Sequence, residues 1–185
     1  MNRQRLTFVF LLFVLITSGS SPSTVAPRKT PEFAIYQSSG KTILLSSLAG
    51  KVVVMEFLFI KSEHCLRVAK TLNKLHSELG SRGFQTVGIT FDPPSGNTGA
   101  QFVSYMVYYL RLTYPVSYSP KADVDKYLGR NGKKILNIPQ IVVIDCAGMI
   151  RATSGGVGGD PRLEDENSLR DLINRLLEEG TATVP

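Results

Sequence analysis

The stretch from Val52 to Ile60 constrains the fold of this 185-residue chain more than any other segment. Its residues are β-branched, aromatic or otherwise apolar, and only Glu56 interrupts the run. A nearly continuous apolar run of this length is typical of a strand that is covered on both faces. We therefore expect this stretch to form the centre of a buried β-sheet.

A helix and a second strand are expected to follow directly. Apolar residues recur at helical spacing from Leu66 to Leu79, the segment Gly80 to Gly83 ends the helix, and Thr86 to Phe91 is again rich in β-branched residues. A strand–helix–strand unit with a crossover of this length pairs its strands in parallel through a right-handed connection. The sequence thus predicts an α/β fold, with the turn Lys61 to Cys65 at the carboxyl end of the central strand.

Further elements complete one domain. Hairpins are expected from residues 33–36 with 42–45 and from 141–145 with 149–153, helices over 100–110 and 121–128, and a short strand over 114–118. Asp160 is placed to cap a final helix that has Pro161 as its first residue.

The first residues are typical of a secretory signal peptide. Arg3 and Arg5 precede an apolar run from Leu6 to Ile16, which is shorter than the roughly 20 residues of a membrane-spanning helix. Cleavage is expected after Gly19 or Ala26. A cleaved signal peptide is favoured over a membrane anchor, and the mature protein would then be exported to the periplasm or cell envelope with no stable membrane span.

This interpretation divides the chain into four parts. We expect a signal peptide over residues 1–26, a flexible linker over 27–31, a domain over 32–179 and a disordered tail over 180–185. The 21 basic side chains fall to 19 once Arg3 and Arg5 are removed, against 15 acidic ones. That excess is too dilute to indicate a nucleic-acid partner.

Three short motifs stand in a fixed order around the central strand. Gly50-Lys51 precedes it, Ser62-Glu63-His64-Cys65 follows it, and Ile138-Pro139 precedes the later strand. Their order and spacing resemble the thioredoxin superfamily, specifically its exported TlpA/ResA-type thiol-disulfide oxidoreductases among the AhpC/TSA redoxins. The resemblance implies a thioredoxin-like fold: a central mixed β-sheet flanked by helices, an N-terminal β-hairpin extension, and a cis bond before Pro139.

The redox pair of that family is incomplete in this chain. Ser62 stands where the family has its nucleophilic cysteine, and Cys65 stands where the family has its resolving cysteine. Dithiol exchange requires a thiolate that attacks a substrate disulfide and a second thiol that resolves the mixed disulfide. A serine hydroxyl cannot form the sulfur–sulfur intermediate. We expect dithiol exchange to be impaired, while exchange by a single thiol stays open.

Cys65 and Glu56 are the candidates for any remaining chemistry. The start of a helix lowers the pKa of a thiol and burial raises it, so Cys65 is either a reactive thiol or a residue retained for packing. Glu56 stands six residues before Ser62, where the resemblance implies a buried acid that accepts a proton from the second cysteine. The alternative for Glu56 is a strand residue that faces solvent or pairs with a lysine.

The remaining motif residues are candidates for binding a protein substrate. In the related families the positions of Glu63 and His64 tune the attacking thiolate, but a helix-start Glu and a solvent-facing His have structural explanations as well. The cis bond between Ile138 and Pro139 would present backbone to an extended peptide. The partner would be a protein thiol or disulfide client, or a protein segment held by a non-catalytic binding module.

A peroxiredoxin-like peroxidase that uses Cys65 is a further alternative. Ser62 and Cys65 have the spacing of a peroxidatic site, but Leu58 stands where that family has a proline. Metal ligands do not cluster, since His64 and Cys65 are adjacent and no second pair appears, so no metal and no other cofactor is expected.

The second cysteine and a group of tyrosines lie outside these motifs. The resemblance implies that Pro139 lies beside Cys65, and at about 3.3 Å per residue the strand after Pro139 would carry Cys146 about 20 Å away, too far for a disulfide with Cys65. It is expected to be an exposed thiol that is able to link two molecules under oxidation. Five tyrosines lie close together in the sequence: Tyr105, Tyr108, Tyr109, Tyr114 and Tyr118. We expect them to pack in or beside the core, and the alternative is that they form a binding face.

Overall fold

The computed structural model describes residues 26–37, 39–91, 98–132, 136–155 and 159–182. The expected signal peptide therefore lies outside the described residues, apart from Ala26. Among the described helices, none has both the length and the apolar character needed to cross a membrane. The strands are β1 (Arg28–Lys29), β2 (Ala34–Tyr36), β3 (Thr42–Leu44), β4 (Val52–Leu58), β5 (Phe84–Thr90), β6 (Val116–Tyr118), β7 (Gln140–Ile144) and β8 (Met149–Thr153). The α-helices are α1 (Glu63–Leu79), α2 (Gly99–Leu110), α3 (Lys121–Tyr127) and α4 (Glu166–Ala182).

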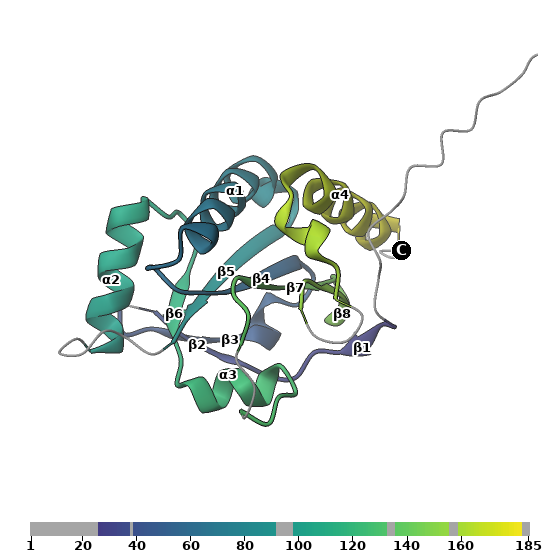
Figure 1. Ribbon diagram of the computed structural model, residues 1–185. Helices are drawn as coiled ribbons and strands as arrows, with labels where there is room; N and C mark the ends of the chain where they lie inside the picture. Colours follow the sequence, from purple (N-terminus) through teal and green to yellow (C-terminus); the bar gives the residue numbers. More distant parts are fainter. Residues whose placement is uncertain (1–25, 38, 92–97, 133–135, 156–158, 183–185) are drawn as a thin grey trace, which may run out of the picture.

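A six-stranded mixed sheet forms the centre of the molecule (Figure 1). Its strand order is β1-β8-β7-β4-β5-β6, and β4, β5 and β6 run parallel to one another. The expected parallel unit around α1 is confirmed. β7 runs antiparallel to β4, with Gln140 opposite Phe57, and β8 returns antiparallel to β7. The separate hairpin of β2 and β3 is also present as expected.

The central strand separates two hydrophobic cores, because its side chains alternate between the two faces of the sheet. Val52, Val54 and Leu58 pack with α1, α2 and α4, whereas Val53, Met55 and Phe57 pack with the hairpin and α3. Figure 1 shows α1 and α4 on one side of the sheet and α3 on the other. The expectation of a strand covered on both faces is therefore confirmed, since all seven residues of β4 are buried.

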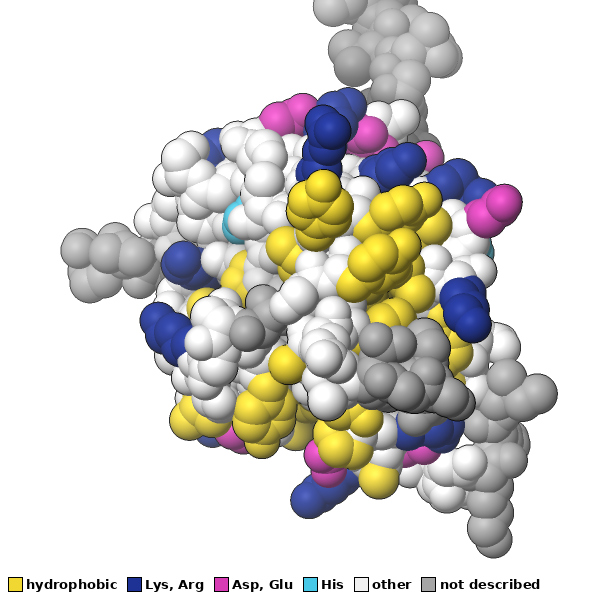
Figure 2. All heavy atoms as spheres, turned by 90° about the vertical axis from the view of Figure 1, so that its left-hand side faces the viewer, with side chains coloured by type: hydrophobic (Ala, Val, Ile, Leu, Met, Phe, Trp, Pro, Cys, Tyr) yellow, Lys and Arg dark blue, Asp and Glu magenta, His cyan; other side chains and the backbone are white. Residues whose placement is uncertain are grey.

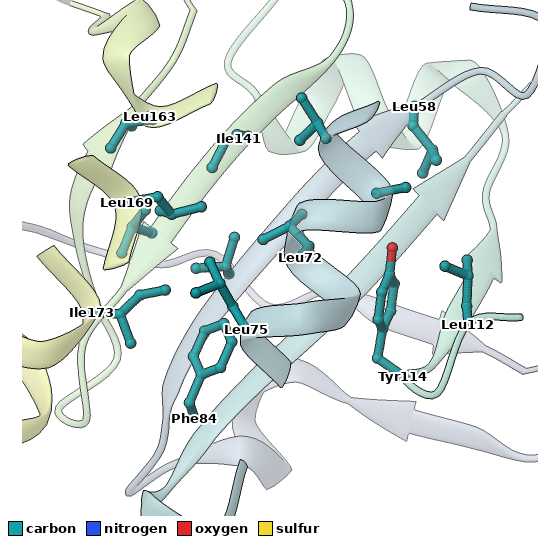
Figure 3. Packing of buried hydrophobic residues seen from close by; sticks show 14 of the residues in the cluster. Leu58, Leu72, Leu75, Phe84, Leu112, Tyr114, Ile141, Leu163, Leu169 and Ile173 are labelled. Atoms are coloured by element: carbon teal, nitrogen blue, oxygen red, sulfur yellow. The ribbon is translucent and has the colours of Figure 1, made fainter. Parts of the chain in front are cut away.

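Helix α1 packs its buried face into the first core. Its buried positions recur at helical spacing and include Leu72 and Leu75, which are wholly inaccessible. Figure 3 shows Leu163 and Leu169 on one side of this helix and Tyr114 on the other. The helix ends at Gly80, and Gly83 then adopts a left-handed φ of 96° that turns the chain into β5. This packing places the first turn of α1 beside the end of β4.

The structure differs from the sequence-based expectation at both ends of the domain. Residues 28 and 29 of the expected linker form β1, which pairs with β8 and so extends the sheet. Residues 180–182 of the expected tail belong to α4. Asp160 caps a 3-10 helix over Pro161–Glu164, η3, rather than the final α-helix. α4 begins after Asp165, whose carboxylate accepts a hydrogen bond from the Ser168 amide at 2.9 Å.

Candidate active site around Cys65

The candidate site lies where β4 ends and α1 begins. β4 ends at Leu58, and α1 begins at Glu63 after Ser62 as its N-cap residue. Because Gln140 lies opposite Phe57 in the antiparallel β4–β7 pair, the chain that enters β7 passes the same end of β4. The bond between Ile138 and Pro139 in that chain is cis, as the resemblance implies. The fold thus brings two of the three sequence motifs to one end of the sheet.

Ser62 is a helix cap. Its hydroxyl accepts a hydrogen bond from the Cys65 amide at 3.3 Å, and its carbonyl accepts one from the Leu66 amide at 3.0 Å. Serine is among the preferred residues at this position because its side chain satisfies an amide that has no partner within the helix. Sequence reasoning compared Ser62 with the cysteine that it replaces and with the hydroxyl residue of a peroxidatic site, and did not identify it as a helix cap. The signal for a cap was present, since Glu63 and a helical pattern follow directly.

Cys65 is wholly buried, with an exposed fraction of 0%. Its Sγ accepts a hydrogen bond from the Phe59 amide at 3.5 Å. Burial raises the pKa of the Cys65 thiol, and the hydrogen bonds involving Ser62 and Phe59 offset this rise only in part. Burial is the largest effect on this thiol, and it acts in the direction opposite to that expected from the helix start. The thiol is therefore neutral and shielded at neutral pH.

Glu56 is also wholly buried, and it lies on the face of β4 that packs against α1. No other described residue forms a hydrogen bond of ordinary geometry with either of its carboxyl oxygens. Burial raises the pKa of the Glu56 carboxyl well above its usual range, while the Tyr114 hydroxyl acts in the opposite direction. The alternative of a solvent-facing Glu56 is wrong.

Gly88 provides the space for Tyr114 beside Glu56. Gly88 is the register partner of Glu56 in the β4–β5 pair. A Cβ atom at Gly88 would lie 3.2 Å from the Tyr114 ring. Tyr114 is 3% exposed, and burial raises the pKa of its hydroxyl well above its usual range. Tyr114 thus belongs to the surroundings of the buried acid, a role that its place in the sequence did not indicate.

A second acid reaches the site from a distant part of the chain. Glu164 of η3 forms an ion pair with His64, with 2.7 Å between Oε2 and Nε2. The charge of Glu164 also contributes to the raised pKa of Glu56. Sequence reasoning missed Glu164, because nothing in the local pattern of η3 relates it to the start of α1. Glu63 lies in the first turn with its side chain exposed.

Cys146 lies at the opposite end of β7, in the turn that leads to β8. It is a free, partly buried cysteine rather than a freely exposed one. A Cβ atom added to Gly180 of α4 would lie only 2.5 Å from the Cys146 Sγ, so the end of α4 packs directly on the sulfur. No group of three potential metal ligands occurs among the described residues.

Comparisons with solved structures support the fold assignment. A thiol:disulfide interchange protein of the thioredoxin family from Chlorobium tepidum TLS has a TM-score of 0.65 and 22% identity, covering 83% of this chain and 98% of its own. The thioredoxin domain of a thiol-disulfide oxidoreductase from Bacteroides vulgatus has a TM-score of 0.61 and 18% identity, covering 84% of this chain and 100% of its own. At these identities the likeness establishes a thioredoxin-like fold.

Sequence comparison gives the family. No curated protein sequence matches the chain. Residues 27–153, which make up more than half of the chain and include β4, α1 and the cis-proline, match the AhpC/TSA family. The chain therefore belongs to the AhpC/TSA family of thioredoxin-like redoxins.

Proposed function

We propose that this protein is an exported redoxin that does not carry out dithiol exchange and instead holds an extended protein segment beside its cis-proline. The observation that carries this proposal is the state of Cys65, which is wholly buried at the start of α1 with Ser62 as its capping neighbour. The N-terminal sequence pattern of Arg3, Arg5 and the following apolar run supports export.

The chemistry of the site supports the loss of dithiol exchange. The reaction needs two thiols in succession, and the first of them must be accessible as a thiolate. Ser62 has no sulfur, and its hydroxyl is already engaged as an acceptor for the Cys65 amide. Burial raises the pKa of the Cys65 thiol, which disfavours the thiolate further. The same burial argues against a peroxidase, since a peroxide would have to reach the Cys65 sulfur.

The backbone near Pro139 supports segment binding. Pro139 is buried, whereas Ile138 is partly exposed. Within the part of the chain that the structure describes, no hydrogen bond involves the Ile138 backbone. A free N–H and C=O at the entrance to a strand are the groups that an added extended segment would use. This backbone lies at the same end of the sheet as the start of α1, although the first redox cysteine is missing.

A second candidate function is slow exchange by the single thiol of Cys65. It is favoured by Glu56, a buried carboxyl with no hydrogen-bond partner of ordinary geometry among the described residues, on the face of β4 that packs against α1. The protonation state of Glu56 would affect how readily the Cys65 thiol loses its proton, because the Glu56 charge contributes to the raised pKa of Cys65.

Alkylation of the thiol separates the two functions. In a Cys146→Ser chain, iodoacetamide labelling of Cys65 is followed by mass spectrometry across pH, with the unfolded chain as the reference. We expect native Cys65 to be labelled far more slowly than unfolded Cys65 at every pH. Rapid native labelling below about pH 7 would establish a reactive thiolate and contradict the binding proposal.

Binding is measured with a permanently unfolded protein, such as reduced and carboxymethylated α-lactalbumin. This chain contains no tryptophan, so the tryptophan fluorescence comes only from the unfolded protein and its change on mixing reports binding. We expect saturable binding that Pro139→Ala weakens and Leu44→Ser leaves unchanged, with circular dichroism as the check that both variants fold. Equal affinity of all three chains would exclude the cis-proline region as the binding site.

A further inference from the structure

Helix α2 is unusual for a helix at the surface. Its twelve residues include no Lys, Arg, Asp or Glu, although the outer face of a surface helix is usually charged or polar. Three of the five large hydrophobic side chains that are exposed in the described part of the chain lie on it: Tyr105 at 55%, Tyr108 at 85% and Tyr109 at 59%. The expectation that these three tyrosines pack in or beside the core is therefore wrong. Figure 2 shows hydrophobic side chains gathered on this side of the molecule.

The exposed side chains of α2 are small in its first half and large in its second half. Ala100, Gln101 and Ser104 are exposed in its first half and carry small or uncharged side chains, whereas the exposed positions of its second half are all tyrosines. Tyr105 and Tyr109 stack, with 5.7 Å between ring centroids and 15° between ring planes. The second half of this face thus protrudes as an ordered aromatic surface, and the first half, with its shorter side chains, forms a low half that is recessed beside it.

A hollow adjoins the low half. It has a volume of about 300 Å³ and opens beside the first turn of α2. Its walls are formed by Tyr36, Gln37, Ala100, Tyr118, Pro120 and Asp123. The Tyr118 ring lies so close to Gly99 that a Cβ atom there would be 2.3 Å away, which gives the hollow a firm aromatic wall. A hollow of this volume is large enough for a tyrosine side chain.

We propose that the occupant of this face is a second copy of the same chain, with the two α2 helices antiparallel across a two-fold axis at Ser104. Such an axis brings position 108 of one copy opposite position 100 of the other, because both lie four residues from the axis. At 1.5 Å per residue, Tyr108 and Ala100 are about 12 Å apart along one helix. Each Tyr108 then enters the hollow of the partner copy, and each protruding half meets a low half.

The absence of charged side chains on α2 is compatible with self-association. Since α2 carries no ionised side chain, two copies of it meet without like-charge repulsion. The antiparallel arrangement also places opposite ends of the two helix dipoles side by side. Tyrosine is enriched at protein interfaces, because it combines a large apolar ring with a hydroxyl that stays hydrated or hydrogen-bonded.

The exposed area indicates a weak dimer. At roughly 200 Å² for one ring, the three exposures amount to about 400 Å² for each copy. A stable interface of standard size buries about 800 Å² for each partner. The exposed tyrosine area is thus about half of that standard, so we expect a dissociation constant in the micromolar range or weaker.

Sedimentation equilibrium of the mature chain, from nanomolar to high micromolar concentration, tests the dimer. We expect a reversible monomer–dimer equilibrium that Tyr108→Ser weakens by at least about tenfold. Leu44→Ser removes another exposed large hydrophobic side chain, 48% exposed against 85% for Tyr108, from the β2–β3 hairpin and is expected to have no effect. A chain that stays monomeric throughout, or a dimer that Tyr108→Ser does not weaken, would overturn the proposal.

Cross-linking tests the position of the axis. In a Cys146→Ser background, Ser104→Cys places a thiol on the axis, so a short bismaleimide should join two copies efficiently. Ser47→Cys, an exposed position in the turn after β3, serves as the matched control and should not be joined. Equal cross-linking of both variants would refute the axis. Binding of a monomeric chain to vesicles of anionic phospholipid through Tyr108 would instead assign the face to a membrane.

Discussion

The hydroxyl of Ser62 accepts a hydrogen bond from the backbone amide of Cys65 at 3.3 Å. The two residues that would form a redox pair in related proteins are therefore joined here as a helix cap and the amide that it satisfies. A single oxygen thus contributes to the stability of α1 at the position where the chemistry of the family requires sulfur.

Restoring the sulfur should restore dithiol chemistry. Ser62→Cys creates a Cys-x-x-Cys site at the start of α1, with the added thiol at a partly exposed position. We expect this variant to catalyse the reduction of insulin by dithiothreitol, measured by turbidity, and the unaltered protein to remain at the uncatalysed rate. The double variant Ser62→Cys with Cys65→Ser should lose the gain. Catalysis by the unaltered protein would contradict the proposed loss of exchange.

Removing the cap should destabilise the fold. Ser62→Ala leaves the Cys65 amide without its side-chain partner, and we expect a loss of about 1 kcal/mol in the free energy of unfolding, measured in urea. Ser62→Asp keeps an acceptor at the N-cap and adds a charge that the helix start favours. It should therefore be clearly more stable than Ser62→Ala. Equal stability of all three proteins would mean that the hydrogen bond contributes nothing.

The buried Glu56 should make stability depend on pH. Because burial raises the pKa of Glu56 in the folded state, the folded protein binds this proton more tightly than the unfolded chain does. Its contribution is most favourable below the unfolded pKa of about 4.3 and declines as pH rises toward the folded pKa, by about 1.4 kcal/mol for each pH unit within that window.

The variant Glu56→Gln tests this dependence. It removes the ionisation and should unfold at higher urea concentration than the unaltered protein near neutral pH, with the difference shrinking toward about pH 4. Glu32→Gln is a control, because hydrogen bonds from Ser46 and Phe33 lower the pKa of that exposed carboxyl and its variant should show the opposite trend. A Glu56→Gln difference that stays constant with pH would rule out a buried titrating group.

Arg111 should be a strained position. It ends α2 with a φ of 51°, the one positive φ found for a residue other than glycine in the described chain. Arg111→Gly removes the Cβ that disfavours this conformation, and we expect a gain of about 0.5–1 kcal/mol in unfolding free energy. Arg111→Ala keeps the Cβ and should show no such gain. If both variants behave alike, the side chain rather than the backbone decides stability there.

The elements that a local pattern specifies were predictable. The apolar run of β4, the helical spacing of α1 and the Ile138-Pro139 motif all identified features that the structure contains. β1 was not predictable, because two residues, Arg28 and Lys29, carry no periodicity and pair only through the edge that β8 offers. Asp160 has the character of a cap, but the sequence alone did not distinguish a 3-10 turn from the start of α4.

The candidate site was predictable in its members and not in its environment. Ser62, Cys65 and Glu56 were identified from spacing and resemblance, yet the complete burial of Cys65 depends on packing between distant segments. Glu164 joins the site through its ion pair with His64, a contact between residues one hundred positions apart in the chain. The spacing of the tyrosines in α2 indicated a helix, while the face that remains outside was decided by the position of α2 beside β6.

The contact between Gly180 and Cys146 limits what can happen to the second thiol. The end of α4 lies against one side of the Cys146 sulfur, so we expect a bulky adduct or an intermolecular disulfide at Cys146 to disturb the last turn of that helix. Modification of Cys146 is therefore coupled to fraying of the carboxyl-terminal end. The rate at which a bulky thiol reagent reacts with Cys146 would report how often the end of α4 detaches. Adding a side chain at Gly180 would loosen that end of the helix permanently.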